Sequence, residues 1–170
     1  MELGLFFPTR APELSGETLA RLGRAADELG FDSLWVPEHV LSFDAPEGSK
    51  SRSRRFELLP EGQGLIDPFA ALAFLAPLTR RIRLGTGVLL GSQRNPVHSA
   101  KLAASIDHLS GGRLDLGLGV GWVREEFDAL GVPFQERGPR SDECIALMRA
   151  LWEQDPSHYT GNLFSLPPSS

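Results

Sequence analysis

The sequence is poor in cysteine and has no long apolar run. Cys144 is the single cysteine among 170 residues, so no intrachain disulfide can form, which is typical of a reducing compartment. The longest weakly polar run, Pro68 to Leu78, is far below the roughly 20 residues that a membrane helix needs. The N-terminus also lacks the basic start and apolar core of a secretory signal. We therefore expect a cytoplasmic protein without a membrane partner.

The sequence has no excess of positive charge either. Its 17 Lys and Arg and 22 Asp and Glu give a net charge of −5 at pH 7, so no positive field attracts a nucleic-acid backbone and we expect no such partner. The 4 histidines are scattered, without an i, i+4 pair or a cysteine nearby, and this predicts no metal site. One basic cluster, Ser49 to Arg55, is either a solvated loop or a contact for an anionic ligand.

Strand and helix signals alternate along the chain, which is the pattern of a parallel α/β sheet with helical crossovers. Ser15 and Asp67 are suitable N-caps, and Pro68 suits a first helical position. We expect strands at Leu3–Phe7, Ser33–Val36, Ile82–Leu90 and Arg113–Val120, and helices at Ser15–Gly30, Pro68–Thr79, Pro96–Gly111, Arg124–Leu130 and Pro139–Glu153. The first helix should bury Leu19, Leu22, Ala26 and Leu29. One domain is expected over residues 1–166, with Leu163–Leu166 as a short strand or extended end, followed by a tail at 167–170.

Two parallel folds suit this pattern. An open doubly wound sheet fits the length, whereas a (β/α)8 barrel usually needs about 250 residues. The segment Gly117 to Trp122 is similar to a dinucleotide fingerprint, but Trp122 stands where the third glycine belongs. Its glycines would either admit a flat cofactor or phosphate to the backbone or allow tight strand packing, and the spacing alone does not distinguish the two.

An ordered series of motifs carries a more specific signal. The chain resembles the luciferase-like monooxygenase family of flavin- and deazaflavin-dependent oxidoreductases, from Leu3 through Phe164, at Leu84–Val88, Arg94–Pro96, Asp107–Arg113, Gly117–Trp122, Glu126-Phe127 and Leu130-Gly131. The resemblance implies a (β/α)8 TIM barrel of which this chain supplies the first four βα units, a half-barrel. Inner strand positions such as Leu5, Val36, Leu84 and Leu118, or their neighbours, would then face the missing strands. Open edges and an open interior predict a homo-oligomer, such as a dimer.

The resemblance also implies a cofactor site at the carboxyl ends of the strands. There an isoalloxazine-type ring leans on a bulge that includes a non-prolyl cis peptide, which Gly87-Val88 matches. Glu38 and His39 match the acidic-His pair at the cofactor edge, where the histidine exchanges a proton and a neighbouring carboxylate can fix its tautomer. From the residues alone, a glycine kink and a hydrogen-bonded histidine are the more common explanations.

The resemblance assigns further positions to this site. Gly121 and Trp122 would contact the cofactor, and Trp122 and Phe7 would line a substrate pocket or act only as packing aromatics. Trp122 occupies the place of the proton-donating glutamate of sugar-phosphate dehydrogenase members, so glucose 6-phosphate is not the expected substrate.

The function implied is hydride transfer between a reduced F420-type deazaflavin (8-hydroxy-5-deazaflavin) and a small organic substrate. An FMN-dependent monooxygenase that uses oxygen is the alternative. The alternative from another functional class is that the chain is a non-catalytic, self-associating half-barrel subunit.

Overall fold

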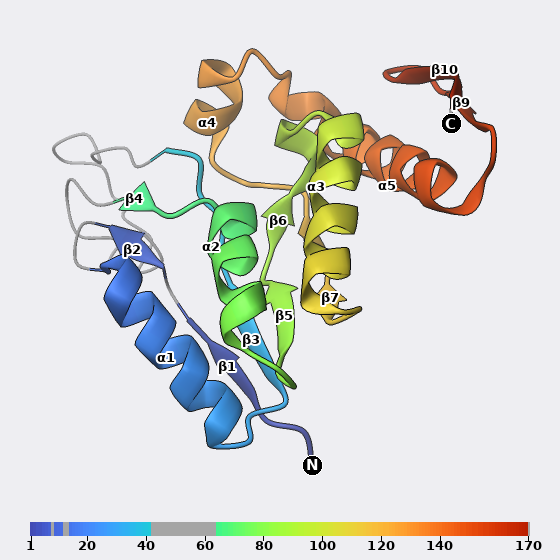
Figure 1. Ribbon diagram of the computed structural model, residues 1–170. Coiled ribbons are helices and arrows are strands. Elements are labelled where there is room, and N and C mark those ends of the chain that lie inside the picture. Colours follow the sequence, from blue (N-terminus) through green and yellow to red (C-terminus); the bar gives the residue numbers. More distant parts are fainter. Residues whose placement is uncertain (8, 12–13, 42–63, 170) are drawn as a thin grey trace, which may run out of the picture.

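The computed structural model describes residues 1–7, 9–11, 14–41 and 64–169 (Figure 1). The basic cluster Ser49 to Arg55 lies outside these residues. Within the described ranges, no helix combines the length and the apolar composition that crossing a membrane requires.

Four parallel strands form the main sheet in the order β1 (Gly4–Phe6), β3 (Ser33–Val36), β5 (Arg83–Thr86) and β7 (Leu114–Asp115) (Figure 1). Beyond β5 and β7 the chain continues into a parallel pair, β6 (Leu89–Leu90) and β8 (Leu118–Gly119). The third and fourth predicted strands are therefore each interrupted once. The spatial order of the strands follows the sequence, as in a (β/α)8 barrel, without the reversal of a doubly wound sheet.

Three helices lie along one face of this sheet: α1 (Gly16–Glu28), α2 (Pro68–Leu75) and α3 (Pro96–Ser110) (Figure 1). The predicted caps are confirmed. The Ser15 hydroxyl accepts the Thr18 N–H, and the Asp67 carboxylate accepts the N–H groups of Phe69 and Ala70. A short 3-10 turn, η2 (Ala76–Leu78), extends α2. The helix predicted to end at Thr79 therefore consists of an α-helix followed by a 3-10 turn.

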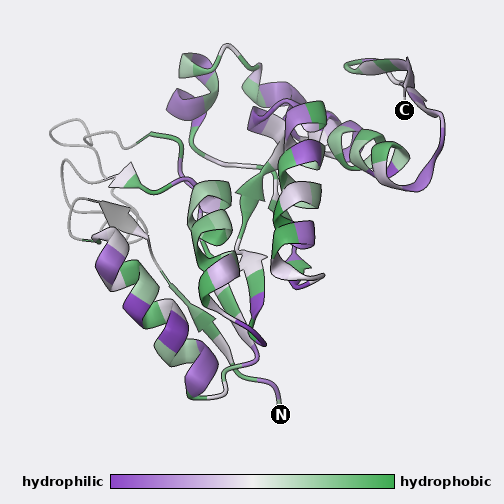
Figure 2. Ribbon diagram, in the orientation of Figure 1, coloured by the Kyte–Doolittle hydropathy of each residue, from purple (hydrophilic) through white to green (hydrophobic). Residues whose placement is uncertain are grey.

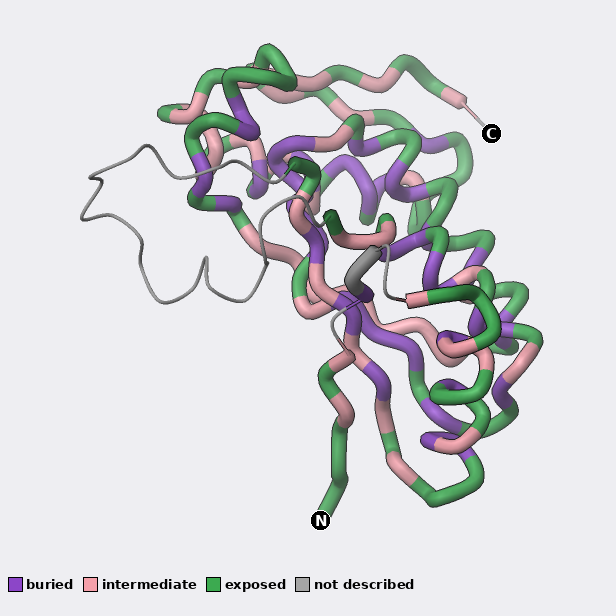
Figure 3. Tube along the Cα trace, turned by 90° about the vertical axis from the view of Figure 1, so that its left-hand side faces the viewer, coloured by how far each residue is buried: buried purple, intermediate pink, exposed green. Residues whose placement is uncertain are grey.

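The core fills the space between the helices and the sheet. Figure 3 shows buried segments concentrated where these two layers meet, and apolar residues follow α2 and the strands in Figure 2. Leu5, Val36, Leu84 and Leu118 all belong to this core or pack against it. These four positions therefore face the helices and not the missing half of the barrel, which leaves the alternative expectation, that their strand neighbours face it.

The alternate strand positions form the opposite, open face of the sheet. Side chains of successive strand residues point to opposite faces, so Phe6 and Trp35 lie away from the helices. Phe6 is 56% exposed. A Cβ atom at Gly85 would come within 2.4 Å of the Trp35 ring. The Trp35 indole thus occupies the space above a neighbouring strand that only glycine leaves open.

Helix α1 departs from its predicted inner face. Leu19 and Ala26 are buried, but Leu22 and Leu29 are exposed, and their places are taken by Gly23 and Asp27. The Asp27 carboxylate accepts three backbone N–H groups at 2.7–2.9 Å, from Arg80, Arg81 and Ile82. Burial on its own would raise the pKa of Asp27, but these hydrogen bonds outweigh it and lower the pKa. Asp27 therefore joins α1 to the start of β5.

The C-terminal part packs against α3. It comprises α4 (Arg124–Ala129), η4 (Phe134–Glu136), α5 (Arg137–Glu153) and an antiparallel hairpin of β9 (Ser157–Thr160) and β10 (Ser165–Ser169). Helix α5 also contacts η3 (Gly91–Gln93), the 3-10 turn that precedes α3. A second small pair joins β2 (Arg10–Ala11) to β4 (Gly64–Leu65). Helix α5 begins before the predicted Pro139, and β10 continues past the predicted domain end at residue 166. Burial raises the pKa of the Cys144 thiol to about 11, so it stays protonated.

Candidate functional site

The predicted site residues meet at the carboxyl ends of the strands, where (β/α)8 enzymes carry their active sites. Glu38 and His39 follow β3, Gly87-Val88 lies between β5 and β6, and Trp122 follows β8. The rings of His39 and Trp122 are in edge-to-face contact, with centroids 5.9 Å apart and planes at 89°. Two predicted residues from distant parts of the chain are therefore neighbours.

The Gly87-Val88 peptide bond is cis, which confirms the prediction for this position. A Cβ atom at Gly87 would lie 3.5 Å from both Phe6 and Trp35, an ordinary contact distance. Val88 is 40% exposed. Its side chain packs on Gly119, where an added Cβ would approach Val88 to 2.4 Å. Gly119 is thus explained by strand packing, one of the two alternatives that the spacing left open.

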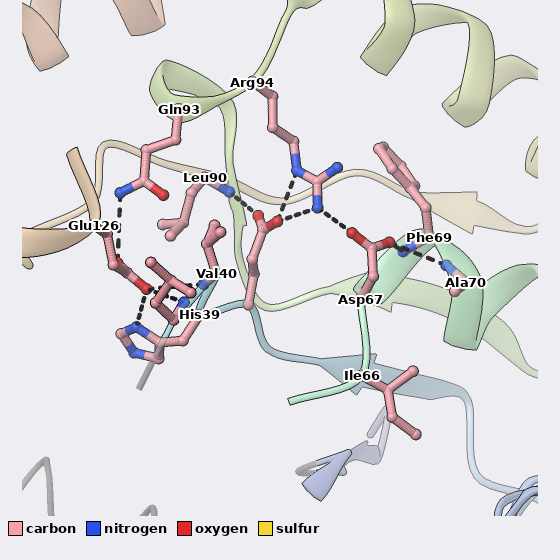
Figure 4. Close-up of polar contacts among 12 residues, drawn as sticks. His39, Val40, Ile66, Asp67, Phe69, Ala70, Leu90, Gln93, Arg94 and Glu126 are labelled. Atoms are coloured by element: carbon pink, nitrogen blue, oxygen red, sulfur yellow. Dashed lines mark hydrogen bonds and ion pairs between the residues drawn. The ribbon is translucent and has the colours of Figure 1, made fainter. Parts of the chain in front are cut away.

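Glu38 is buried and engaged on both carboxylate oxygens. One oxygen accepts the Leu90 N–H, and the other pairs with Arg94, whose Nε lies 2.7 Å away. Figure 4 shows that Arg94 also reaches Asp67, the N-cap of α2. Burial alone would lower the pKa of Arg94, but its two carboxylate partners outweigh this and raise it. The prediction that Glu38 pairs with His39 is corrected, because Glu38 instead joins β3 to β6 and, through Arg94, to α2.

The carboxylate partner of His39 is Glu126, on α4. His39 Nδ1 lies 3.2 Å from Glu126 Oε1, and the same oxygen accepts the N–H groups of Val40 at 2.8 Å and Leu41 at 3.2 Å (Figure 4). The Glu126 side chain is fully buried. Burial would raise its pKa, yet the hydrogen bonds from His39 and Leu41 lower it below the ordinary value. In the sequence Glu126 stands out only as part of the Glu126-Phe127 motif, and its position between the apolar residues Val123 and Phe127 is the signal of burial.

Gln93, on η3, completes the polar cluster. Its Nε2 lies 3.5 Å from the second carboxylate oxygen of Glu126. Its Oε1 is buried and has no hydrogen-bond partner among the described residues. A buried carbonyl without a partner costs about 1–3 kcal/mol, so such an atom marks a place that a ligand or water can complete.

Gly121 has a structural explanation of its own. Its φ of +75° is in the left-handed region that favours glycine, and an added Cβ would meet the Phe127 ring at 2.9 Å. A cofactor contact at Gly121 stays a prediction. Phe7 is partly buried and packs against the core, whereas Phe6 is exposed beside Gly87. We therefore transfer the pocket-lining role from Phe7 to Phe6.

Exposed apolar side chains lie at the same ends of the strands as this polar cluster. Each of them lies at or just beyond the carboxyl end of a strand and is 39–56% exposed: Phe6, Val40, Leu41, Val88, Val120 and Trp122. Ligand sites combine mostly apolar walls with a few placed polar groups. A flat, largely apolar ring system with a polar edge fits this set of residues, with Val88 and Trp122 as apolar contacts and His39 as a polar one.

The fold is that of half a (β/α) barrel, and the comparison with known proteins agrees. Residues 1–169 match the profile of the luciferase-like monooxygenase family. The chain belongs to the luciferase-like monooxygenase family.

Two relatives show the range of proteins that the chain is similar to. A protein of Mycobacterium tuberculosis named Rv0953c and described as uncharacterized is 35% identical over 156 residues, which are 91% of this chain and 55% of the relative. An F420-dependent glucose-6-phosphate dehydrogenase of Amycolatopsis mediterranei is 29% identical over 164 residues, 94% of this chain and 45% of the relative. The chain thus spans about half the length of the curated relatives it matches.

Solved structures show the same relationship. Monooxygenase RslO1 of Streptomyces bottropensis superimposes with a TM-score of 0.78 at 32% identity, over 99% of this chain and 48% of that one. The oxygenating component of 3,6-diketocamphane monooxygenase from Pseudomonas putida, solved with FMN, gives 0.77 at 21% identity over 98% of this chain and 43% of that one, which shows the fold alone. The chain has the fold of half a luciferase-like TIM barrel, and the proteins it matches include an F420-dependent dehydrogenase and a monooxygenase solved with FMN.

Proposed function

We propose that this chain forms the coenzyme-facing half of an oxidoreductase that transfers hydride between a reduced F420-type deazaflavin and a small organic substrate. The observation that carries the proposal is the position of His39, which is held by a buried carboxylate and lies against exposed Trp122 at the strand ends. Similarity to an F420-dependent dehydrogenase gives it further support. A bound deazaflavin supplies or accepts the hydride.

The residues of the candidate site have separate roles in this proposal. The exposed side chain of Val88, on the packed support of Gly119, offers an apolar contact to a flat ring. Trp122 and Phe6 form apolar walls for a small substrate and limit its contact with water. His39 gives or takes the proton that must accompany hydride transfer to or from a carbonyl group.

FMN-dependent oxygenation is the alternative chemistry for the same site. It is favoured by the 32% identity to monooxygenase RslO1, which exceeds the identity to the F420-dependent dehydrogenase. The two differ in their requirement for oxygen, because oxygen-dependent turnover points to FMN.

Self-association is a second proposal, favoured by the exposure of Phe6 on the open sheet face. A half-barrel leaves strand edges and this face without cover, and edges of that kind pair readily with another chain. Two copies joined edge to edge would surround the site with eight strands. The proposal therefore predicts a homodimer whether or not the chain is catalytic.

The experiment supplies the 170-residue chain with reduced F420 or with reduced FMN, with and without oxygen, and with a panel of small ketones and aldehydes. The proposal predicts alcohol formation and F420 oxidation in equal amounts, in the absence of oxygen. Oxygen-dependent product formation with FMN alone would replace it by the alternative. Absence of turnover with both coenzymes, in a folded chain of any oligomeric state, would leave only the non-catalytic subunit.

A further inference from the structure

We propose that Glu126 is the positioning residue that fixes His39 in one tautomer, with its hydrogen on Nδ1 and its lone pair on Nε2. The inference rests on the proposed function for its catalytic consequence, but not for the tautomer itself. Neither residue is near the other in sequence, and the contact joins the end of β3 to α4.

The donors around Glu126 Oε1 determine the direction of the hydrogen bond. The backbone N–H groups of Val40 and Leu41 both point at this oxygen, at 2.8 and 3.2 Å, and a backbone N–H can only donate. An ionised carboxylate is an acceptor only. The third neighbour of the same oxygen, His39 Nδ1 at 3.2 Å, must therefore carry a hydrogen and donate it.

The second nitrogen of the ring is then the basic one. In a neutral imidazole one nitrogen donates and the other accepts, so a hydrogen on Nδ1 places the lone pair on Nε2. Figure 4 shows this nitrogen on the side of the His39 ring that points away from Glu126. The side chain is 25% exposed, so solvent or substrate can reach it. The edge-to-face contact with Trp122 restricts rotation of the ring.

The burial of Glu126 makes this arrangement rigid. The fully buried carboxylate receives hydrogen bonds from three different residues on one oxygen and from Gln93 on the other. Rotation of Glu126 would leave the partly buried backbone N–H groups of Val40 and Leu41 without this acceptor, which costs free energy. The same bonds that anchor the backbone after β3 therefore also hold the acceptor in place for His39.

The test is 15N NMR of the histidine rings in the free chain, at a mildly alkaline pH where imidazoles are neutral. The exposed His98, His108 and His158 serve as internal references and should show mixed tautomers. His39 should show the Nδ1–H tautomer alone. A His39 that carries its hydrogen on Nε2, or that shows the mixture of the exposed rings, overturns the proposal.

Three variants separate positioning from general damage. Glu126→Gln keeps an acceptor oxygen and should retain the Nδ1–H tautomer, whereas Glu126→Leu should give mixed tautomers. Glu125→Gln, at the exposed neighbouring position on α4, should match the wild type. A folded Glu126→Leu chain with unchanged His39 signals overturns the proposal. If that variant does not fold, loss of the Nδ1–H tautomer in Glu126→Gln overturns it, and retention supports it.

Kinetics then test the link to the proposed function. Glu126→Leu should lower kcat while coenzyme affinity stays within about tenfold, and Glu126→Gln should recover part of kcat. A single His39 tautomer in a chain without turnover would contradict the proposed function and leave the role of Glu126 intact. Mixed tautomers in an active chain would contradict the role of Glu126 alone.

Discussion

Glu38 and Arg94 form an ion pair in which the glutamate side chain is 2% exposed and the arginine side chain 21% exposed. The pair joins the segment after β3 to the segment after β6, and Arg94 extends it to Asp67 at the start of α2. Glu38, next to His39 in sequence, therefore connects the segments beneath the site. Glu126, 87 positions from His39 in sequence, contacts the imidazole.

This pair predicts a large loss of stability when the arginine is removed. Arg94→Ala leaves the buried Glu38 carboxylate without its cation, and we expect the free energy of unfolding to fall by about 3–5 kcal/mol. Urea unfolding followed by circular dichroism measures the change. Arg149→Ala, at an exposed position of α5, should change it by less than about 0.5 kcal/mol. Equal effects of the two substitutions would show that the ion pair does not stabilise the fold.

Asp27 predicts a second, independent effect on stability. In Asp27→Asn the amide NH2 replaces one carboxylate oxygen and faces a backbone N–H, so one of the three hydrogen bonds becomes a donor–donor contact. We expect a loss of about 2–3 kcal/mol. Glu28→Gln neutralises the adjacent exposed carboxylate of α1 and is the matched control. An Asp27→Asn chain as stable as Glu28→Gln would contradict the assignment.

The lowered pKa values of Asp27 and Glu126 predict acid sensitivity. An acid whose pKa is lower in the folded chain binds fewer protons there than in the unfolded chain, so it adds stability above its ordinary pKa. That stability is lost as the pH falls from the ordinary value through the lowered one. We expect the free energy of unfolding to decrease as the pH drops below about 4.5.

The Glu126 contribution is isolated by substitution. Glu126→Gln should lower stability at neutral pH and flatten the acid dependence, whereas Glu125→Gln should keep the wild-type slope. Urea unfolding at a series of pH values gives these slopes. A Glu126→Gln chain with the full wild-type slope would assign the acid sensitivity to other groups.

His39 predicts a kinetic effect without a large change in binding. His39→Ala should depress turnover and leave coenzyme affinity within about tenfold, since one uniform contact contributes roughly 1.4 kcal/mol or less. His98→Ala, at an exposed position of α3, is the control. Steady-state kinetics and coenzyme titration provide the two values. Unchanged turnover in His39→Ala would make this residue structural.

The local features of the fold were accessible from the sequence. The strand Ser33–Val36 and the caps Ser15 and Asp67 were predicted as observed, because strand composition and capping are decided by neighbouring residues. The cis bond at Gly87-Val88 came from the family resemblance. Periodicity alone wrongly predicted that Leu22 and Leu29 are buried. Helix α2 approaches α1 closely at Gly23, and Asp27 accepts hydrogen bonds from the backbone before β5, so α1 buries these small and polar residues instead.

The partners within the site were not accessible in the same way. Adjacent residues in an extended segment point in different directions, so the proximity of Glu38 and His39 in sequence did not make them a pair. Which face of the sheet Val36 and Leu84 occupy depends on where the helices cross, and alternation does not specify this. The contact of His39 with Glu126 is formed by tertiary structure alone.

The most direct measurement is an equilibrium titration of oxidised F420, and separately FMN, into the chain, followed by coenzyme fluorescence. We expect saturable binding of F420 that Val88→Asp weakens by at least about tenfold, because the charged group replaces an apolar contact at the ring site. Val97→Asp, at a position of α3 with nearly equal exposure, 38% against 40% for Val88, should leave binding unchanged. Absence of saturable binding of both coenzymes, or equal binding by Val88→Asp and wild type, would contradict a coenzyme site at Val88.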